Sequence, residues 1–284
     1  MTQASRGAVT DVLVEQTAID APNEARWPAW LDDAFWPSVT LQVDVVEVSR
    51  GQAFAQVSQL LAHGALFQQV SQPRAKGRGS RPEDRLQAAA DALSAPWRKS
   101  MRELARLAGA NPVTLRTGPV RVNSAHPLAR RSLFPEAGRV PELLARLWSR
   151  LPAIGCPLRA VQWALCLLLI HPLLDGNGRT ARLVYAALLW RLRQVDPLLL
   201  LGFALMFERS HSQLQLSFVH LRSGDASQLR TTFEQACGRA RTEFAPWVGR
   251  LGRAVGEQSS ASAQGELENL RQRLLLLIDA CPVH

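Results

Sequence analysis

Between positions 171 and 182 the sequence gathers side chains that together could act on phosphate. His171 is the only nearby group whose ordinary pKa lies close to neutrality, so it is the candidate base for a hydroxyl that attacks phosphorus. Asp175 carries the oxygen ligands that Mg²⁺ prefers. Arg179 and Arg182 are three residues apart, so on a helix they share a face and can both reach a polyphosphate. This set of residues predicts a phosphate-transfer site.

Two glycines stand at the centre of the segment. Gly176 and Gly178 flank Asn177, and glycine allows backbone conformations that can point successive N–H groups at one concavity. If a helix begins near Arg179, its positive end faces the same place. We therefore expect residues 176–178 to form a cradle for phosphate.

An almost wholly apolar run, 163–170, comes directly before His171. The polar cluster thus begins where a buried helix has to stop, and polar chemistry at such a position usually serves function. The periodicity predicts a buried helix over about 159–170 and a second helix over about 179–193.

The rest of the chain also has mainly helical patterns, so we predict an all-α fold, a helical bundle with one short β-hairpin flap. The alternating stretch 115–134 is the expected flap. Pro141 suits the first turn of a helix over 140–151. Further helices are expected over 43–66, 85–93, 97–107, 196–218 and 227–245.

We expect three regions along the chain. Residues 1–90 form an N-terminal helical appendage with a Trp-Pro cluster and a basic loop over 72–82. Residues 91–250 form the core that carries the motif. Residues 251–284 form a C-terminal helix.

Composition narrows the possible surroundings of the protein. The 284 residues carry a formal net charge of +9, which permits a phosphate or nucleic-acid partner without requiring one. The four cysteines are far apart and fit reduced structural thiols better than disulfides or a zinc site. The N-terminus has no apolar signal segment, and charges interrupt the most apolar region, 183–207. We expect a cytoplasmic protein with no membrane partner.

The motif closely resembles the signature of Fic-domain proteins. In that signature a His-Pro-Phe opens the loop, an Asp or Glu precedes Gly-Asn-Gly-Arg, and a second Arg follows three residues later. The chain matches at His171 and from Asp175 to Arg182, and it departs at Leu173, where Phe is usual. Leu173 is expected to serve as the apolar anchor of the loop.

Neighbouring segments are also similar to Fic domains, and the resemblance covers roughly residues 91–245. The segment that carries the target-docking flap is resembled by 116–122, 134–135 and 140–144. The helix that follows the motif is resembled by 210–225, with Leu214 and Gln215 where two adjacent tyrosines are often found.

The resemblance implies transfer of AMP from ATP to a Ser, Thr or Tyr hydroxyl of a target protein docked at the 116–135 flap. It implies that His171 takes the hydroxyl proton and that Asp175 binds Mg²⁺. It also implies that Gly176, Asn177, Gly178 and Arg179 cradle the phosphates while Arg182 holds the γ-phosphate.

Many Fic proteins carry an inhibitory Glu that pairs with the second arginine. The nearest match to that pattern here is Ser262 to Glu266, followed by Leu267, and it is not intact. Inhibition is therefore lost, supplied by Glu266, or supplied by a separate antitoxin protein.

Two other functions remain open. Residues 101–116 resemble the start of a DNA-binding helix-turn-helix, although Gly118-Pro119 would end the second helix after about one turn. A catalytically silent Fic scaffold is the other alternative. Nucleic acid is not the expected partner, and Arg116 and Arg121 are interpreted as ordinary surface or flap arginines.

Overall fold

The computed structural model describes residues 49–62, 81–120, 134–208 and 227–279. Every regular element in these ranges is a helix, which agrees with the predicted all-α class. The β contact found there is a single antiparallel bridge between Leu115 and Leu173. Most of the predicted flap, 121–133, lies outside the described residues, so the hairpin stays a prediction.

A buried helical hairpin forms the centre of the molecule. Helix α5 (Pro157–Ile170) begins with proline in its first turn, where the missing N–H costs no hydrogen bond. Almost all of its residues are buried, so it is covered on every side. Helix α6 (Asn177–Arg191) packs against it and is buried along most of its length. The six residues between the two helices are 171–176, which open the predicted motif.

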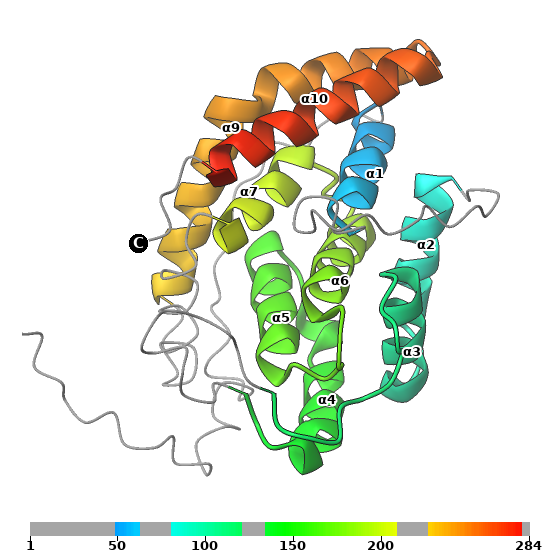
Figure 1. Cartoon of the computed structure of the whole chain (residues 1–284), viewed down its shortest axis with the longest axis vertical. Helices are drawn as coiled ribbons and strands as arrows, with labels where there is room; N and C mark the ends of the chain where they lie inside the picture. Colours follow the sequence, from blue (N-terminus) through cyan, green and yellow to red (C-terminus); the bar gives the residue numbers. More distant parts are fainter. Residues whose placement is uncertain (1–48, 63–80, 121–133, 209–226, 280–284) are drawn as a thin grey trace, which may run out of the picture.

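Three shorter helices pack around this hairpin (Figure 1). Helix α4 (Val140–Ser149) begins with Pro141 in its first turn, as predicted, and packs on α5. There the Trp163 indole donates a hydrogen bond of 2.9 Å to the Leu147 carbonyl, and its ring meets Trp148 edge-on at 4.9 Å. Helices α2 (Pro82–Ala92) and α3 (Trp97–Leu107) pack against α6.

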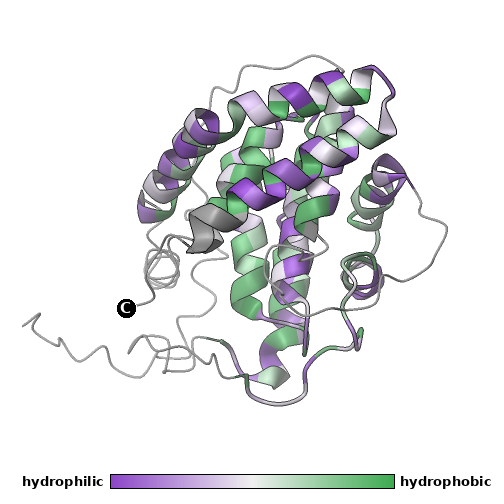
Figure 2. Ribbon diagram, turned by 45° about the horizontal axis from the view of Figure 1, so that its top comes forward, coloured by the Kyte–Doolittle hydropathy of each residue, from purple (hydrophilic) through white to green (hydrophobic). Residues whose placement is uncertain are grey.

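Longer helices close the other end of the molecule (Figure 1). Helix α7 (Pro197–Glu208) packs against α9 (Ser227–Gly256), and α10 (Ser260–Asp279) lies along α9. Helix α1 (Ser49–Ala62) lies against α2, α6 and α9. Hydrophobic residues concentrate on the central helices, whereas the outer long helices carry many polar ones (Figure 2). The apolar core thus surrounds α5 and α6 and holds the turn between them.

The described helices match most of the predicted ones, and the largest difference is in α9. We expected a helix ending near 245, but α9 continues through Pro246 to Gly256. Proline removes one intrahelical hydrogen bond, and the apolar contacts of this stretch, including buried Val248 and Leu251, maintain the helix. The Trp-Pro cluster, the basic loop up to residue 80 and Leu214 and Gln215 lie outside the described residues. The predicted division at 90 and 250 stays a prediction.

Three cysteines, Cys156, Cys166 and Cys237, are described, and all three side chains are buried. Burial raises the pKa of the Cys166 thiol well above its ordinary value and that of Cys237 to about 12. A thiol that stays protonated is a poor nucleophile, so these residues act as small apolar side chains, as predicted. Within the described ranges, no helix has both the length and the apolar character needed to cross a membrane.

We expect Gly202→Ala to destabilise the fold because α7 approaches α9 closely at this glycine. An added Cβ would lie 2.7 Å from the Cys237 Sγ and 3.0 Å from its Cα, so the helices would have to separate. The free energy of unfolding, measured in urea, should fall by roughly 1–3 kcal/mol. Gly238→Ala in α9 is the matched control, because nothing lies within 4 Å of its Cβ position. The control should be stabilised by about 1 kcal/mol, and equal effects of the two changes would contradict this view of the packing.

Candidate functional site

The predicted catalytic residue lies where α5 ends. His171 caps the helix in the left-handed conformation, with φ 49° and ψ 58°. This conformation costs a residue with a Cβ roughly 1–2 kcal/mol, so the surrounding structure has to hold it. The left-handed turn directs the chain away from the buried helix and into the polar loop.

The His171 ring is largely enclosed. Phe134 packs against it, with ring centroids 4.1 Å apart. Burial is the main cause that lowers the pKa of His171 to about 4, and the nearby Arg116 cation acts in the same direction. The Leu168 carbonyl acts in the opposite direction, although the buried Nδ1 makes no hydrogen bond of ordinary geometry. His171 is therefore neutral at pH 7, the form that can accept a proton.

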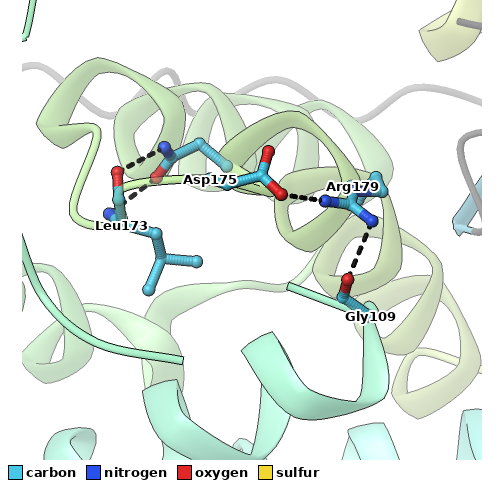
Figure 3. A network of polar contacts seen from close by, with 5 residues as sticks. Gly109, Leu173, Asp175 and Arg179 are labelled. Atoms are coloured by element: carbon cyan, nitrogen blue, oxygen red, sulfur yellow. Dashed lines mark hydrogen bonds and ion pairs between the residues drawn. The ribbon is translucent and has the colours of Figure 1, made fainter. Parts of the chain in front are cut away.

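Asn177 closes the loop with its side chain. Its amide oxygen accepts a hydrogen bond of 2.9 Å from the Leu173 N–H, and its amide nitrogen donates one of 2.8 Å to the Leu173 carbonyl (Figure 3). Leu173 is 1% exposed, as expected of an apolar anchor, whereas the adjacent Leu174 is 59% exposed. Because both polar atoms of the Asn177 amide are used inside the loop, this side chain is a brace. The expected part of Asn177 in a phosphate cradle stays a prediction.

The two glycines have different roles. Gly176 is left-handed, with φ 83°, and a Cβ there would lie 2.8 Å from the Ala110 Cβ. Glycine is needed here both for the conformation and for the close approach to the segment after α3. Gly178 lies in the first turn of α6, and a Cβ there would lie 3.3 Å from an Arg182 guanidinium nitrogen. Gly178 thus leaves room for that arginine.

Asp175 and Arg179 form an ion pair on the exposed side of the loop. The guanidinium donates to the Asp175 carboxylate at 2.5 Å and to the Gly109 carbonyl at 2.8 Å (Figure 3). The Asp175 side chain is 52% exposed, so this pair adds little to stability. The carboxylate therefore remains accessible to a cation. Within the described part of the chain, no group of three or more His, Cys, Asp or Glu side chains is placed to bind a metal.

Arg182 is more deeply placed than a surface phosphate ligand would be. It is 6% exposed, and its Nε donates a hydrogen bond of 3.1 Å to the Leu61 carbonyl at the end of α1. One guanidinium nitrogen still lies beside Gly178, next to the start of α6. The end of α1 thus belongs to the surroundings of the site, although the sequence assigned it only to an appendage.

The structure brings one further arginine into the site. Arg116 is 2% exposed, and its Nε donates a hydrogen bond of 2.7 Å to the His171 carbonyl. The interpretation of Arg116 as a surface arginine was wrong, whereas its place in the predicted flap stays a prediction. No local pattern signals this burial, because the carbonyls that accept its hydrogen bonds come from three separate segments.

These groups favour an anionic ligand. No side chain caps the start of α6, so the N–H groups of its first turn and the positive end of its dipole face the loop. Arg116, Arg179 and Arg182 surround the loop, and Asp175 opposes them, so the loop region carries a net positive charge with His171 neutral. A polyphosphate matches both the charge and the uncapped N–H groups.

The helix-turn-helix alternative does not agree with this structure. After α3 ends at Leu107, residues 108–120 form no helix, so this segment has no recognition helix. Arg116, which that interpretation would expose to DNA, is buried.

Glu266, the candidate inhibitory residue, forms an ion pair of 3.0 Å with Arg250 of α9.

Comparison with protein-family models finds no match, and comparison with curated proteins finds none either. Among solved structures, the chain is similar to a Fic family protein from Desulfovibrio desulfuricans G20, with a TM-score of 0.44 and 20% sequence identity. The similarity covers 78% of this chain and 74% of that chain. At this identity and score the similarity assigns neither a family nor an activity to the chain.

The depressed pKa of His171 predicts a loss of stability in acid. The ordinary pKa of histidine is 6.5 and that of His171 is about 4, so the unfolded chain binds a proton that the folded chain refuses. The contribution of the neutral His171 to the free energy of unfolding is complete above pH 6.5 and decreases as the pH falls towards 4. At pH 5 it should have decreased by about 2 kcal/mol.

The measurement is the free energy of unfolding in urea at pH 7.5 and pH 5, for the wild type and for His171→Asn. Asparagine tolerates the left-handed conformation and does not titrate, so it is the matched control. The wild type should lose about 2 kcal/mol more than the variant between the two pH values. An equal loss in both proteins would show that His171 is not held neutral by burial.

Proposed function

We propose that the protein is an adenylyltransferase that transfers AMP from ATP to a hydroxyl side chain of a target protein. The observation that carries the proposal is the α5–α6 turn, where a neutral histidine precedes an uncapped helix start flanked by arginines. The Fic-like sequence of this turn supports transfer of AMP over other phosphate chemistry. A silent scaffold is less well supported, because each charged position of the motif is present.

His171 would act as the base. The ring buries its Nδ1 inside the protein, so Nε2 would be the atom that accepts the proton of the attacking hydroxyl. The hydroxyl oxygen would bond to the α-phosphorus, the bond to the bridging oxygen would break, and pyrophosphate would leave. A base with a pKa of about 4 is weak. The negative charge of bound ATP would raise the pKa of His171 towards neutrality and so strengthen the base.

The first turn of α6 would bind the phosphates through its N–H groups. Arg179 would reach them from the exposed side once Asp175 exchanges this partner for a cation. Arg182 would reach the far end of the polyphosphate from beside Gly178. Since Arg182 also donates to the end of α1, ATP binding and the position of α1 would be linked.

The residues present fit Mg²⁺, because Asp175 offers one half-exposed carboxylate beside the phosphate cradle. Mg²⁺ usually takes one or two carboxylates and completes its shell with phosphate oxygens and water. Asp175 would hold the ion, which when bound supplies positive charge to the polyphosphate. We further propose a cytoplasmic reaction, a target that docks along the 116–135 flap, and control by a separate protein where no internal inhibitor acts.

We expect label from α-labelled ATP, and none from γ-labelled ATP, on the protein itself or on a lysate protein in the presence of Mg²⁺. His171→Ala should lower the rate of labelling by about 10²–10⁴-fold, because it removes the base. ATP binding, measured by calorimetry, should persist in the variant. Arg253→Met, an exposed change on α9, is the control and should label like the wild type. Label from the γ-position alone would indicate a kinase, and unchanged labelling in His171→Ala would exclude it as the base.

Glu266→Gly should change the labelling rate by less than about threefold, or under ~0.7 kcal/mol of barrier. The reason is that the Glu266 carboxylate pairs with Arg250 on α9. Glu266→Gln serves as a second variant, since it removes the charge without the helix cost of glycine. Strong activation in both variants would show that Glu266 restrains the site.

A further inference from the structure

A buried cation lies behind the base. Among the described residues, every hydrogen-bond partner of the Arg116 guanidinium is a main-chain carbonyl. The distances are 2.7 Å to His171, 3.3 Å to Ile170, 3.0 Å to Gly118 and 2.5 Å to Pro135. The side chain thus joins three segments that are far apart in the sequence.

Two of these carbonyls belong to the end of α5. The carbonyls of the last turn of a helix lack intrahelical partners, and a cation there also interacts favourably with the helix dipole. Arg116 satisfies the Ile170 and His171 carbonyls together, which fixes the peptide planes on both sides of the left-handed turn. Its own N–H donates to the Pro172 carbonyl at 2.8 Å, so the next peptide is held as well.

The third segment positions the ring. Arg116 holds the Pro135 carbonyl, and the preceding residue, Phe134, packs its ring against His171. The same guanidinium therefore restrains the His171 backbone and the residue that covers its side chain.

We propose that Arg116 is a positioning residue that holds the base, His171, in its left-handed conformation and against Phe134. The proposal rests on the proposed function, in which His171 accepts the proton of the attacking hydroxyl. Among the described residues the Arg116 guanidinium donates only to protein carbonyls, so it would act on the reaction through His171.

Structural support alone does not account for a charge at this position. Burial lowers the pKa of Arg116, which reports the cost of keeping a cation away from water, and no described carboxylate offsets that cost. The charge does serve the site, because it adds to the effect of burial in lowering the pKa of His171 and adds positive potential behind the predicted phosphate cradle.

The test compares Arg116→Lys and Arg116→Met, with Arg253→Met as the control. Lysine keeps the charge but lacks the planar fork that reaches several carbonyls. We expect Arg116→Lys to lower kcat for AMP transfer about 10²-fold, because the base is misplaced. The KM for ATP should stay within about threefold of the wild type. Unchanged kcat in Arg116→Lys would overturn the proposal.

The His171 ring gives a readout that does not need activity. Its titration, followed by NMR, should rise from about 4 in Arg116→Met, because the cation that adds to the effect of burial is removed and the contact that holds Phe134 over the ring is lost. It should rise less in Arg116→Lys, which keeps the charge. If the wild type transfers no AMP, the proposed function fails, while this titration still tests the contact. An unchanged His171 titration in Arg116→Met would overturn the proposal.

Hydrogen exchange of the wild type covers the case in which the variants do not fold. The Arg116 Nε–H should exchange with water on the order of 10²-fold more slowly than that of exposed Arg253, because it is buried and hydrogen-bonded. Equal exchange rates would overturn the proposal.

Discussion

The site depends on one local constraint, the closure of the α5–α6 turn by the Asn177 side chain. Its amide pairs with both backbone polar groups of Leu173, so two residues four positions apart are held as rigidly as a pair in a sheet. Leu173 is buried in the core, which fixes the brace to the rest of the fold. The positions of Asp175 and of the first turn of α6 follow from this closure. A loop with so many polar groups would otherwise be mobile, because its hydrogen bonds could be replaced by water.

The constraint is effective because the helices on either side are buried along most of their length. A helix that is apolar on every side cannot rotate or slide without exposing core residues, so α5 presents its C-terminal end in one orientation. The strained conformation of His171 is then maintained by packing and by the carbonyl contacts of Arg116. Several small local terms, each worth about 1 kcal/mol, together give a defined geometry.

Much of this architecture can be predicted from the sequence, because it depends on local patterns. The bounds of α3 and the proline start of α4 agree with the periodicity, and the position of the motif between two buried helices follows from the apolar run before His171. The burial of Arg116 could not be predicted, since its carbonyl partner at His171 is 55 positions away. The hydrogen bonds of Asn177 to Leu173 could not be predicted either, because residue type alone does not show where an amide points. The Leu61 contact of Arg182 spans 121 positions and is equally invisible to local reasoning.

The hydrogen-bond partners of the arginines affect the net charge of the site. A carboxylate partner would orient a guanidinium but would also neutralise it. A carbonyl orients the guanidinium through its dipole and leaves the net charge intact. Arg116 is held by carbonyls, Arg179 donates to the Gly109 carbonyl and Arg182 to that of Leu61. The described carboxylate that pairs within the loop, Asp175, is half-exposed and so can exchange partners at low cost. The geometry is therefore set before any ligand binds, while the positive charge remains available to an incoming polyanion.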